Sequence, residues 1–306
     1  MKIFITGGAG YIGTALAEKL AVLDEIKEIV LFDNLSRPNY NLFLGNPIPN
    51  GNKVHFVKGD LLDTRKLKKE VVGADVVYHL AAKVTTPFAN SDPHSYEQVN
   101  HWGTAELVYA LEEQKVSKLI YLSSTSVYGA TDEEVDEYSP VNAKTYYGLS
   151  KLRGEKHVQR LADKVNALVI RCGNVYGYNK SMRFDAVINR FMLDAHFNRR
   201  ISIHGNGKQV RAFIHINRAA ASLASMAVGS MESGVYNLVD RNLQVLDIVD
   251  VLKEIYPDLE FIFVDQHIGL RELKVNSVKT ELDHVLQQNS DDIKSELIDF
   301  KNQFSF

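Results

Sequence analysis

Cysteine is almost absent from this sequence: Cys172 is the single one among 306 residues. One cysteine cannot close an intramolecular disulfide, and no group of Cys and His residues has zinc-ligand spacing, so no metal site is expected. No run of 18 apolar residues occurs, which excludes a transmembrane helix, and the apolar stretch at residues 1–5 is too short for a secretion signal. These absences predict a cytoplasmic protein without membrane association.

An excess of charge of either sign is also missing. Lys and Arg number 35 against 38 Asp and Glu, which gives a formal net charge of -3. Without a basic field, nucleic acid is not an expected partner. Hydrophobic residues make up 45% of the chain, and a chain of this length buries about 75% of its unfolded surface. The composition therefore predicts one large domain, or a core domain with a smaller lobe.

The first half of the chain alternates short apolar runs with longer amphipathic segments. This alternation is typical of βαβ units, and the continuous apolar runs indicate a parallel sheet covered on both faces. We therefore predict an α/β fold with a Rossmann-type doubly wound sheet and right-handed crossovers. Strands are predicted at 2–6, 28–32, 54–58, 74–80, 118–123 and 166–171, and helices at 11–23, 64–72, 95–114 and 145–163.

The order of elements becomes less regular after about residue 173. We predict a Rossmann domain over residues 1–172 and a smaller C-terminal α/β substrate lobe over 173–306, with the chain free to cross back between them. Strands are predicted at 201–204, 212–215, 235–238 and 260–264, and helices at 186–197, 217–228, 245–256 and 290–302.

A glycine-rich turn joins the first strand to the first helix. Gly7, Gly10 and Gly13 have the spacing G-x-x-G-x-x-G, with Tyr11 and Ile12 between the last two. Such a turn lets the backbone approach a pyrophosphate, and the N–H groups of the following helix bind its oxygens. Because the strand before and the helix after are both present, the pattern favours a dinucleotide site.

A carboxylate closes the second strand. Asp33 lies 20 residues after Gly13, where such a group binds the adenosine ribose and favours NAD over NADP. The alternative interpretation is an ordinary turn or helix-capping aspartate, and the nearby Arg37 leaves NADP open. Asp60, after the third strand, either caps the next helix or contacts the adenine.

Tyr147 and Lys151 are spaced i, i+4 on a predicted helix and therefore share one face. A free phenol has a pKa of about 10 and is a poor base at neutral pH. A neighbouring ammonium and an oxidised nicotinamide would lower that pKa, and a phenolate then accepts a proton from a hydroxyl. A surface Tyr/Lys pair is the alternative. The hydroxyls of residues 123–126 end the fifth strand, at the edge where open α/β sheets bind ligands.

Taken together, these motifs resemble the extended short-chain dehydrogenase/reductase family, in its nucleotide-sugar epimerase/dehydratase branch, and most of all the UDP-glucose 4-epimerases. The resemblance extends over nearly the whole chain. It rests on residues 6–13, Asp33-Asn34-Leu35, Gly59-Asp60-Leu61, His79-Leu80-Ala81-Ala82, Asn100 before Gly103-Thr104, residues 123–129, Tyr147-x-x-x-Lys151, Arg171-x-x-Asn174-Val175-Tyr176-Gly177 and Gly205-Asn206-Gly207-x-x-Val210-Arg211.

The resemblance implies a role for each matching residue. Ser124 is expected to bond the sugar oxygen, Tyr147 to act as the base, and Lys151 to assist it and to anchor the cofactor ribose. NAD is the implied cofactor, a nucleotide-diphosphate sugar the implied substrate, and a homodimer through helices 95–114 and 145–163 the implied assembly. The implied NAD ligands are Gly7, Gly10, Tyr11, Ile12, Gly13, Asp33, Asn34, Asp60, Leu61, Leu80, Ala81, Ala82, Asn100, Tyr147 and Lys151, and the implied substrate ligands are Lys83, Ser124, Thr125, Asn174, Arg211 and Arg271.

Some positions depart from the family pattern. Ala212 follows Arg211 where relatives have aspartate, and Asn217-Arg218 replaces an acidic pair. Tyr178 stands where proline is common, and Cys172 where an aromatic residue often lies near the nicotinamide. The catalytic groups are all retained.

The residues after Ser124 bear on the reaction. Related 4,6-dehydratases carry an acidic residue, often an Asp-Glu pair, where this chain has Thr125 and Ser126. An elimination needs such groups as base and acid. Their replacement by hydroxyls predicts NAD-dependent epimerisation through a transient keto-sugar, with C4 as the expected carbon. An NAD(P)-dependent reductase or dehydrogenase, a dehydratase and a non-enzymatic NAD-sensing protein are the alternatives.

Overall fold

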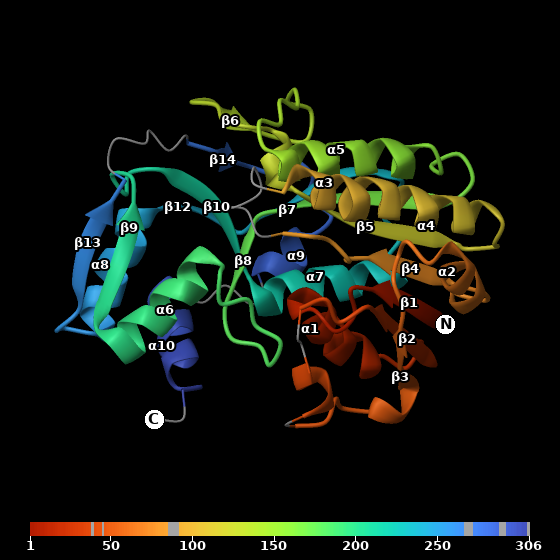
Figure 1. The fold of residues 1–306 in the computed structure, drawn as a ribbon, viewed down its shortest axis with the longest axis horizontal. Helices are drawn as coiled ribbons and strands as arrows, with labels where there is room; N and C mark the ends of the chain where they lie inside the picture. Colours follow the sequence, from red (N-terminus) through yellow and green to blue (C-terminus); the bar gives the residue numbers. More distant parts are fainter. Residues whose placement is uncertain (38–39, 45, 85–91, 266–271, 288–291, 305–306) are drawn as a thin grey trace.

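A Rossmann-type sheet of seven parallel strands forms the centre of the computed structural model (Figure 1). The structure describes residues 1–37, 40–44, 46–84, 92–265, 272–287 and 292–304. The strand order is β11-β7-β5-β4-β1-β2-β3. These strands are β1 (Lys2–Thr6), β2 (Glu28–Asp33), β3 (Val54–Lys58), β4 (Val76–His79), β5 (Lys118–Ser124), β7 (Asn166–Cys172) and β11 (Gly234–Leu238).

Helices cover both faces of this sheet, which confirms the predicted doubly wound α/β fold. Successive side chains of a strand point to opposite faces, so Ile3 and Ile5 of β1 enter one core and Phe4 enters the other. All three side chains are fully buried, which contributes about 1.5–3 kcal/mol each. One face carries α1 (Tyr11–Ala21) and α7 (Ile216–Val228), and the other carries α2 (Thr64–Glu70), α4 (Gly103–Glu112) and α5 (Tyr146–Gln159).

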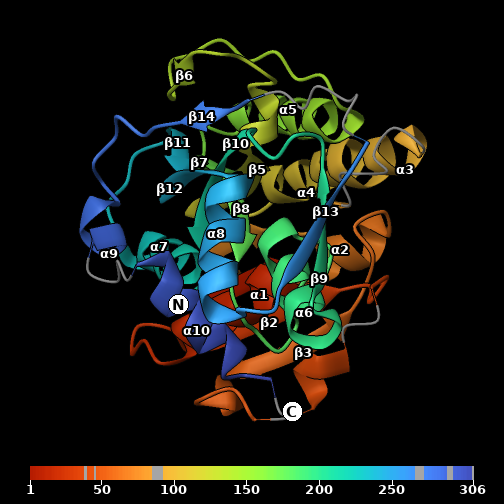
Figure 2. The same cartoon turned by 90° about the vertical axis from the view of Figure 1, so that its left-hand side faces the viewer.

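The smaller lobe lies to the left of the Rossmann sheet in Figure 1 and faces the viewer in Figure 2. Its own core includes Ile188, Phe191, Ile248, Leu252 and Leu297, all buried. Its elements are β8 (Asn174–Tyr176), α6 (Val187–Asn198), β9 (Arg200–His204), β10 (Val210–His215), β12 (Arg241–Gln244), α8 (Val245–Ile255), β13 (Glu260–Val264) and α10 (Ile293–Lys301). The remaining short elements are α3 (Pro93–Tyr96), β6 (Glu134–Val135), β14 (Lys274–Val275) and α9 (Asp283–Gln287).

The chain returns from this lobe to the Rossmann sheet. Helix α7 packs against α1, and the hydroxyl of Tyr78 in β4 donates to the carbonyl of Leu223 in α7 at 2.6 Å. Strand β11 then adds to the sheet beside β7, with Val235 opposite Val169. Residues 216–238, which lie beyond the predicted boundary at residue 172, therefore belong to the central sheet and its helix layer. They supply the edge strand that covers β7.

The strands that the sequence did not indicate are short: β6, β8, β12 and β14 have two to four residues each. So few residues show no periodicity. The predicted helix 95–114 instead forms α3, a π-helical segment over Glu97–Trp102, and α4. The π-helical segment widens the turn around Asn100.

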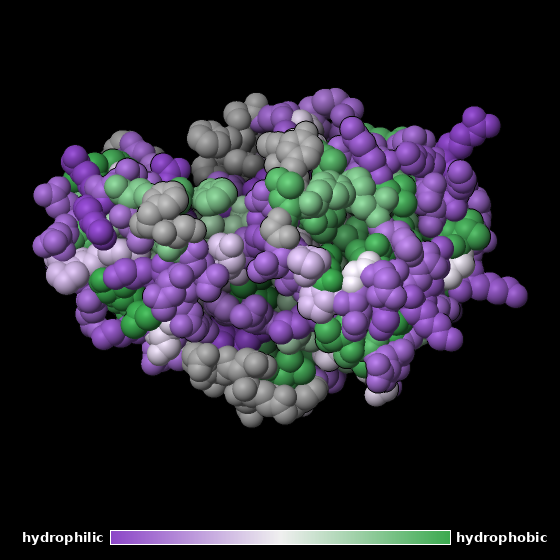
Figure 3. All heavy atoms as spheres, turned by 90° about the horizontal axis from the view of Figure 1, so that it is seen from below, coloured by the Kyte–Doolittle hydropathy of each residue, from purple (hydrophilic) through white to green (hydrophobic). Residues whose placement is uncertain are grey.

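The surface view in Figure 3 shows one face on which hydrophilic residues dominate and apolar residues gather in separate patches. Within the described ranges, no helix combines the length and apolar character needed to cross a membrane. Trp102 and Tyr109 are 54% and 38% exposed on the helices of the predicted dimer interface. The dimer stays a prediction.

Candidate active site

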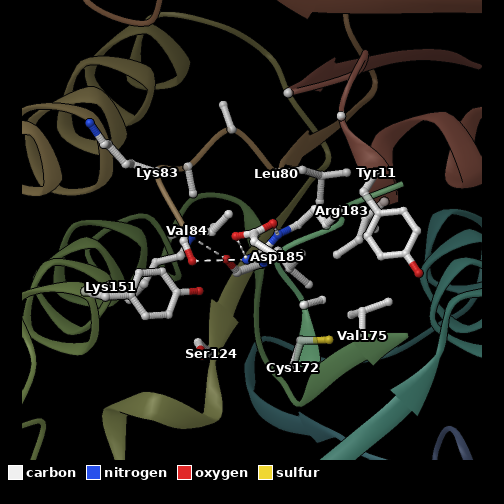
Figure 4. A pocket seen from close by; sticks show the side chains of 18 of the residues that line it. Tyr11, Leu80, Lys83, Val84, Ser124, Lys151, Cys172, Val175, Arg183 and Asp185 are labelled. Carbon is white, nitrogen blue, oxygen red and sulfur yellow. Dashed lines mark hydrogen bonds and ion pairs between the residues drawn. The ribbon is translucent and has the colours of Figure 1, made fainter. Parts of the chain in front are cut away.

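A cavity of about 670 Å³ opens at the carboxyl ends of the central strands. This is the edge at which parallel α/β sheets bind ligands. One wall comes from the glycine turn and the ends of β2, β4 and β5, and the other comes from β7, β8, β9, β10 and α6. Figure 4 shows side chains from both walls converging on the cavity.

The glycine turn suits a dinucleotide because glycine has no side chain, which leaves the backbone open to a ligand. Gly7 has φ +72°, a left-handed conformation that favours glycine. A Cβ at Gly13 would lie 2.4 Å from the carbonyl oxygen of Gly7, so only glycine lets α1 lie this close to the turn. Helix α1 begins at Tyr11, and its N-terminal N–H groups face the cavity edge where a pyrophosphate would bind.

Asp33 organises this turn as well as lining the cavity. Its Oδ2 accepts from the N–H of Ala9 at 3.1 Å and its Oδ1 from Leu35 at 2.8 Å. Burial raises the pKa of Asp33, and these two bonds oppose the rise. Asn34 donates to Asp60 at 2.8 Å. The cavity therefore has a polar end of carboxylate and amide groups suited to an adenosine.

Leu61, Leu80, Ala81 and Ala82, which are predicted NAD ligands, line the cavity, and Asn100 is not among the described lining residues. The Asn100 side chain is buried, accepts from the N–H of Lys83 at 2.7 Å and donates to its carbonyl at 2.9 Å. These bonds fix the backbone of Lys83 in the cavity wall, and a contact of Asn100 with NAD stays a prediction.

Lys83, a predicted substrate ligand, lines the cavity with its ammonium turned elsewhere. The Nζ pairs with Asp92 at 3.0 Å. Figure 4 shows the side chain running away from the centre of the cavity. The structure thus gives this ammonium a partner within the protein.

The cavity brings Ser124, Tyr147 and Lys151 together. Ser124 ends β5 opposite Cys172 of β7, and Tyr147 and Lys151 stand one turn apart on α5. The N-cap Thr145 accepts from the N–H of Gly148 at 3.1 Å and so sets where this helix begins.

Burial is the largest influence on the pKa values of Tyr147 and Lys151. It raises the pKa of Tyr147, against the hydrogen bond with Ser124 and the positive charge of Arg183. It lowers the pKa of Lys151 to about 7, while Glu155 opposes this shift. The Lys151 ammonium donates to the carbonyl of Leu122 at 2.7 Å. Without a bound nicotinamide, burial therefore leaves the Tyr147 pKa above its ordinary value, and the lowering expected from the ammonium and the nicotinamide together stays a prediction.

Of the other predicted substrate residues, Asn174 and Arg211 lie on the lobe side, and Thr125 lies beside Ser124. Asn174 donates to the carbonyl of Ala212 at 3.0 Å. Arg211 donates to the carbonyl of Val210 at 2.9 Å, and burial lowers its pKa. All three line the cavity. Arg271 lies outside the described residues.

Sequence reasoning missed several lining residues. Arg183 and Asp185 come from the loop between β8 and α6 and pair with each other at 2.8 Å. Ser202, His204 and Gln209 line the lobe wall. These positions carry no motif. A sequence signal exists only for Arg183 and Asp185, which follow closely after β8 and Gly177.

The cavity agrees with the chain's similarity to known proteins. The model of the NAD dependent epimerase/dehydratase family matches residues 3–238. A dTDP-D-glucose 4,6-dehydratase of Mus musculus is 30% identical over 261 residues, which cover 83% of this chain and 72% of the mouse protein. A putative UDP-glucose 4-epimerase of Methanocaldococcus jannaschii is 28% identical, with 82% and 81% covered.

A solved structure is similar along almost its entire length. It is the UDP-glucuronic acid 4-epimerase of Bacillus cereus in complex with UDP-glucuronic acid and NAD. The two chains are 25% identical, the TM-score is 0.85, and 99% of this chain and 98% of that one are covered. The chain belongs to the NAD dependent epimerase/dehydratase family, and NAD is its cofactor.

Proposed function

We propose that this protein catalyses the NAD-dependent epimerisation of a nucleotide-diphosphate sugar at C4, through a transient keto-sugar. The observation that carries the proposal is a cavity in which Ser124, Tyr147 and Lys151 meet while the adjoining turn bears Thr125 and Ser126. This set can move one proton and support a reversible hydride transfer. The described part of the turn adds no carboxylate for an elimination.

The chain's own residues perform the proton transfer. As a phenolate, Tyr147 accepts the C4 hydroxyl proton and becomes the phenol, and Ser124 binds the same oxygen and keeps it in line. NAD, when bound, would supply the reversible hydride acceptor that oxidation of C4 and reduction from the other face of the sugar require. Lys151 stands one turn from Tyr147 on α5, where its protonated form would stabilise a phenolate. Burial of Tyr147 excludes water from the proton transfer.

The lobe side holds the rest of the substrate. Arg211 offers a guanidinium fork that matches phosphate oxygens, and Asn174 lies on the same wall. With the diphosphate held there, the keto-sugar turns before the hydride returns. The cofactor ends in its starting state, so turnover needs no net NADH.

A 4,6-dehydratase is the second candidate, because the mouse relative has that activity in its name. Elimination requires an acid and a base beside the sugar. The described cavity walls include three carboxylates, Asp33, Asp60 and Asp185. The first two belong to the adenosine end. Burial would raise the pKa of Asp185, but Arg183 holds it below its usual value, which makes Asp185 a poor acid.

Proton NMR of separate mixtures with UDP-glucose, UDP-N-acetylglucosamine, UDP-glucuronic acid, GDP-mannose and dTDP-glucose tests the proposal. We expect a new anomeric signal that approaches an equilibrium mixture in one tube, without net absorbance at 340 nm. A 4-keto-6-deoxy product would establish the dehydratase instead. Net NADH formation or consumption would establish a dehydrogenase or reductase.

A further inference from the structure

One ion pair in the cavity has no direct part in the proposed proton transfer, although the charge of Arg183 acts on the pKa of Tyr147. Arg183 donates to both oxygens of Asp185, from Nε at 3.2 Å and from Nη2 at 2.8 Å. The same Nη2 donates to the carbonyl of Val84 on the opposite wall at 3.3 Å. Figure 4 shows the pair lying between the two walls. The side chains are 23% and 36% exposed, so a ligand can reach them.

The loop that carries this pair is tied to the glycine turn. Asn189 is fully buried, accepts from the N–H of Gly177 at 3.0 Å and donates to the carbonyl of Arg183 at 3.0 Å. Tyr11, beside Gly10, donates its hydroxyl proton to the carbonyl of Gly177 at 2.5 Å. These bonds hold the backbone of Arg183 in a fixed place relative to the turn where phosphates are expected.

The Arg183–Asp185 pair also affects the pKa of Arg37, another cavity-lining residue. Burial lowers the pKa of Arg37, and the charge of Arg183 lowers it further, whereas Asp185 and Asp33 oppose this. Two guanidinium groups thus lie near each other and are compensated by two carboxylates. A ligand anion that entered between them would compete with those carboxylates.

We propose that Asp185 occupies the place of a ligand phosphate on Arg183, and that a phosphate of the bound ligand displaces it. A carboxylate that accepts two parallel bonds from a guanidinium uses the geometry that a phosphate uses. The cavity has two further phosphate-binding features, the glycine turn and Arg211. The phosphate comes either from the dinucleotide or from the substrate; the second source rests on the proposed function.

Isothermal titration of the purified, dialysed protein with NAD and, separately, with UDP tests this competition. The variants are Asp185→Asn, Arg183→Gln and the double variant. We expect Asp185→Asn to tighten binding of at least one ligand by about tenfold and Arg183→Gln to weaken the same ligand. In the Arg183→Gln background, Asp185→Asn should change nothing, because the competition is gone.

Asp194→Asn on α6 is the matched control. Asp194 pairs with Arg190 at 2.7 Å and, like Arg190, lies outside the cavity lining. Its loss changes the net charge equally and should leave both affinities unchanged. Urea unfolding of every variant shows whether the fold is kept.

The outcomes separate the sources. Tighter NAD binding alone assigns Arg183 to the dinucleotide, and tighter UDP binding alone assigns it to the substrate diphosphate. Unchanged or weaker binding of both by Asp185→Asn overturns the proposal, as does a gain that persists in the Arg183→Gln background. A protein that binds NAD more tightly but epimerises no sugar keeps this inference and loses the proposed function.

Discussion

The two reactive side chains on α5 are both shifted toward their neutral forms by burial. Tyr147 has a raised pKa, and Lys151 a pKa of about 7. A buried phenolate is therefore unfavourable unless positive charge accompanies it. A cofactor carrying a positive ring beside Lys151 would supply that charge only when bound, which links base strength to cofactor binding.

Replacing Tyr147 by phenylalanine tests the base directly. We expect Tyr147→Phe to reduce turnover by about 10²- to 10⁴-fold, because the proton acceptor is lost. NAD binding should be largely kept, since the ring remains. NMR of the substrate mixture measures turnover, and titration measures NAD affinity.

Tyr146→Phe is the control for this variant. Tyr146 is the adjacent residue and is 42% exposed, and it is not among the described cavity-lining residues. It should retain full turnover. Normal activity of Tyr147→Phe, or loss of activity in both variants, would contradict the assignment of the base.

His79 predicts a pH dependence of stability. Its ring is fully buried between Thr6 at 2.7 Å and Thr104 at 2.9 Å, and burial lowers its pKa to about 3. The unfolded chain, with an ordinary histidine pKa near 6.5, then binds more protons than the folded one between pH 3 and 6.5. The free energy of unfolding should therefore rise with pH across this window and level off above it.

The variant His79→Gln replaces the imidazole with an amide, which still forms hydrogen bonds but does not take up a proton in this pH range. Urea unfolding at pH 5.0 and 7.5 measures the effect. We expect the stability difference between the two pH values to be smaller in His79→Gln than in the unmodified protein. Equal differences would show that His79 does not control this dependence.

At the scale of the elements, the geometry of the β1–turn–α1 unit requires glycine, with no side chain, at particular positions. Gly7 requires a left-handed backbone, and Gly13 allows α1 to lie against the turn. The phosphate-binding N–H groups are placed by that close approach. The geometry of this unit is local, which explains why the sequence alone predicted it.

Gly13→Ala should damage this unit. The added Cβ would lie 2.4 Å from the Gly7 carbonyl, so the helix must shift, at a cost of about 1–3 kcal/mol. NAD affinity should fall as the N–H groups move. Urea unfolding and NAD titration measure the two effects.

Gly51→Ala is the control, because a Cβ there meets nothing within 4 Å. It should leave NAD affinity unchanged. If Gly13→Ala bound NAD as well as Gly51→Ala, the close approach of α1 would not be required for the site.

The molecule as a whole is joined by a buried ionic cluster. Arg218 of α7 is 1% exposed and pairs with Asp240 and with Glu296 of α10, while Arg241 pairs with the same two carboxylates. Glu296 also accepts from the hydroxyl of Tyr176 in β8. The cluster connects the Rossmann layer, the lobe and the C-terminal helix.

Arg218→Met should therefore destabilise the whole protein. Removing one member of a buried cluster leaves uncompensated charge, which costs about 3–5 kcal/mol. Urea unfolding measures the loss. Lys294→Met is the control on α10: Lys294 pairs with Glu254 at 2.7 Å, but both side chains are at least half exposed. It should cost less than about 1 kcal/mol. Equal losses would contradict a role for the buried cluster.

Local patterns foretold much of the fold. The sheet strands β1 and β3 have the predicted bounds, and β2, β5 and β7 differ by one residue. Strands covered on both faces are continuous apolar runs and are readily seen in sequence. The short strands of the lobe were missed, and so was the π-helical segment, because long-range contacts and not propensity stabilise them.

The sequence by itself determined the Rossmann-type sheet, the glycine turn and the Tyr147–Lys151 spacing, since each depends on residues close together in the chain. Only the tertiary structure decided which lobe residues reach the cavity. Arg183 donates to the carbonyl of Val84, which is 99 residues away in the chain, and residues 216–238 return to the sheet. Burial, which sets the pKa values of Tyr147 and Lys151, also arises only when distant segments pack together.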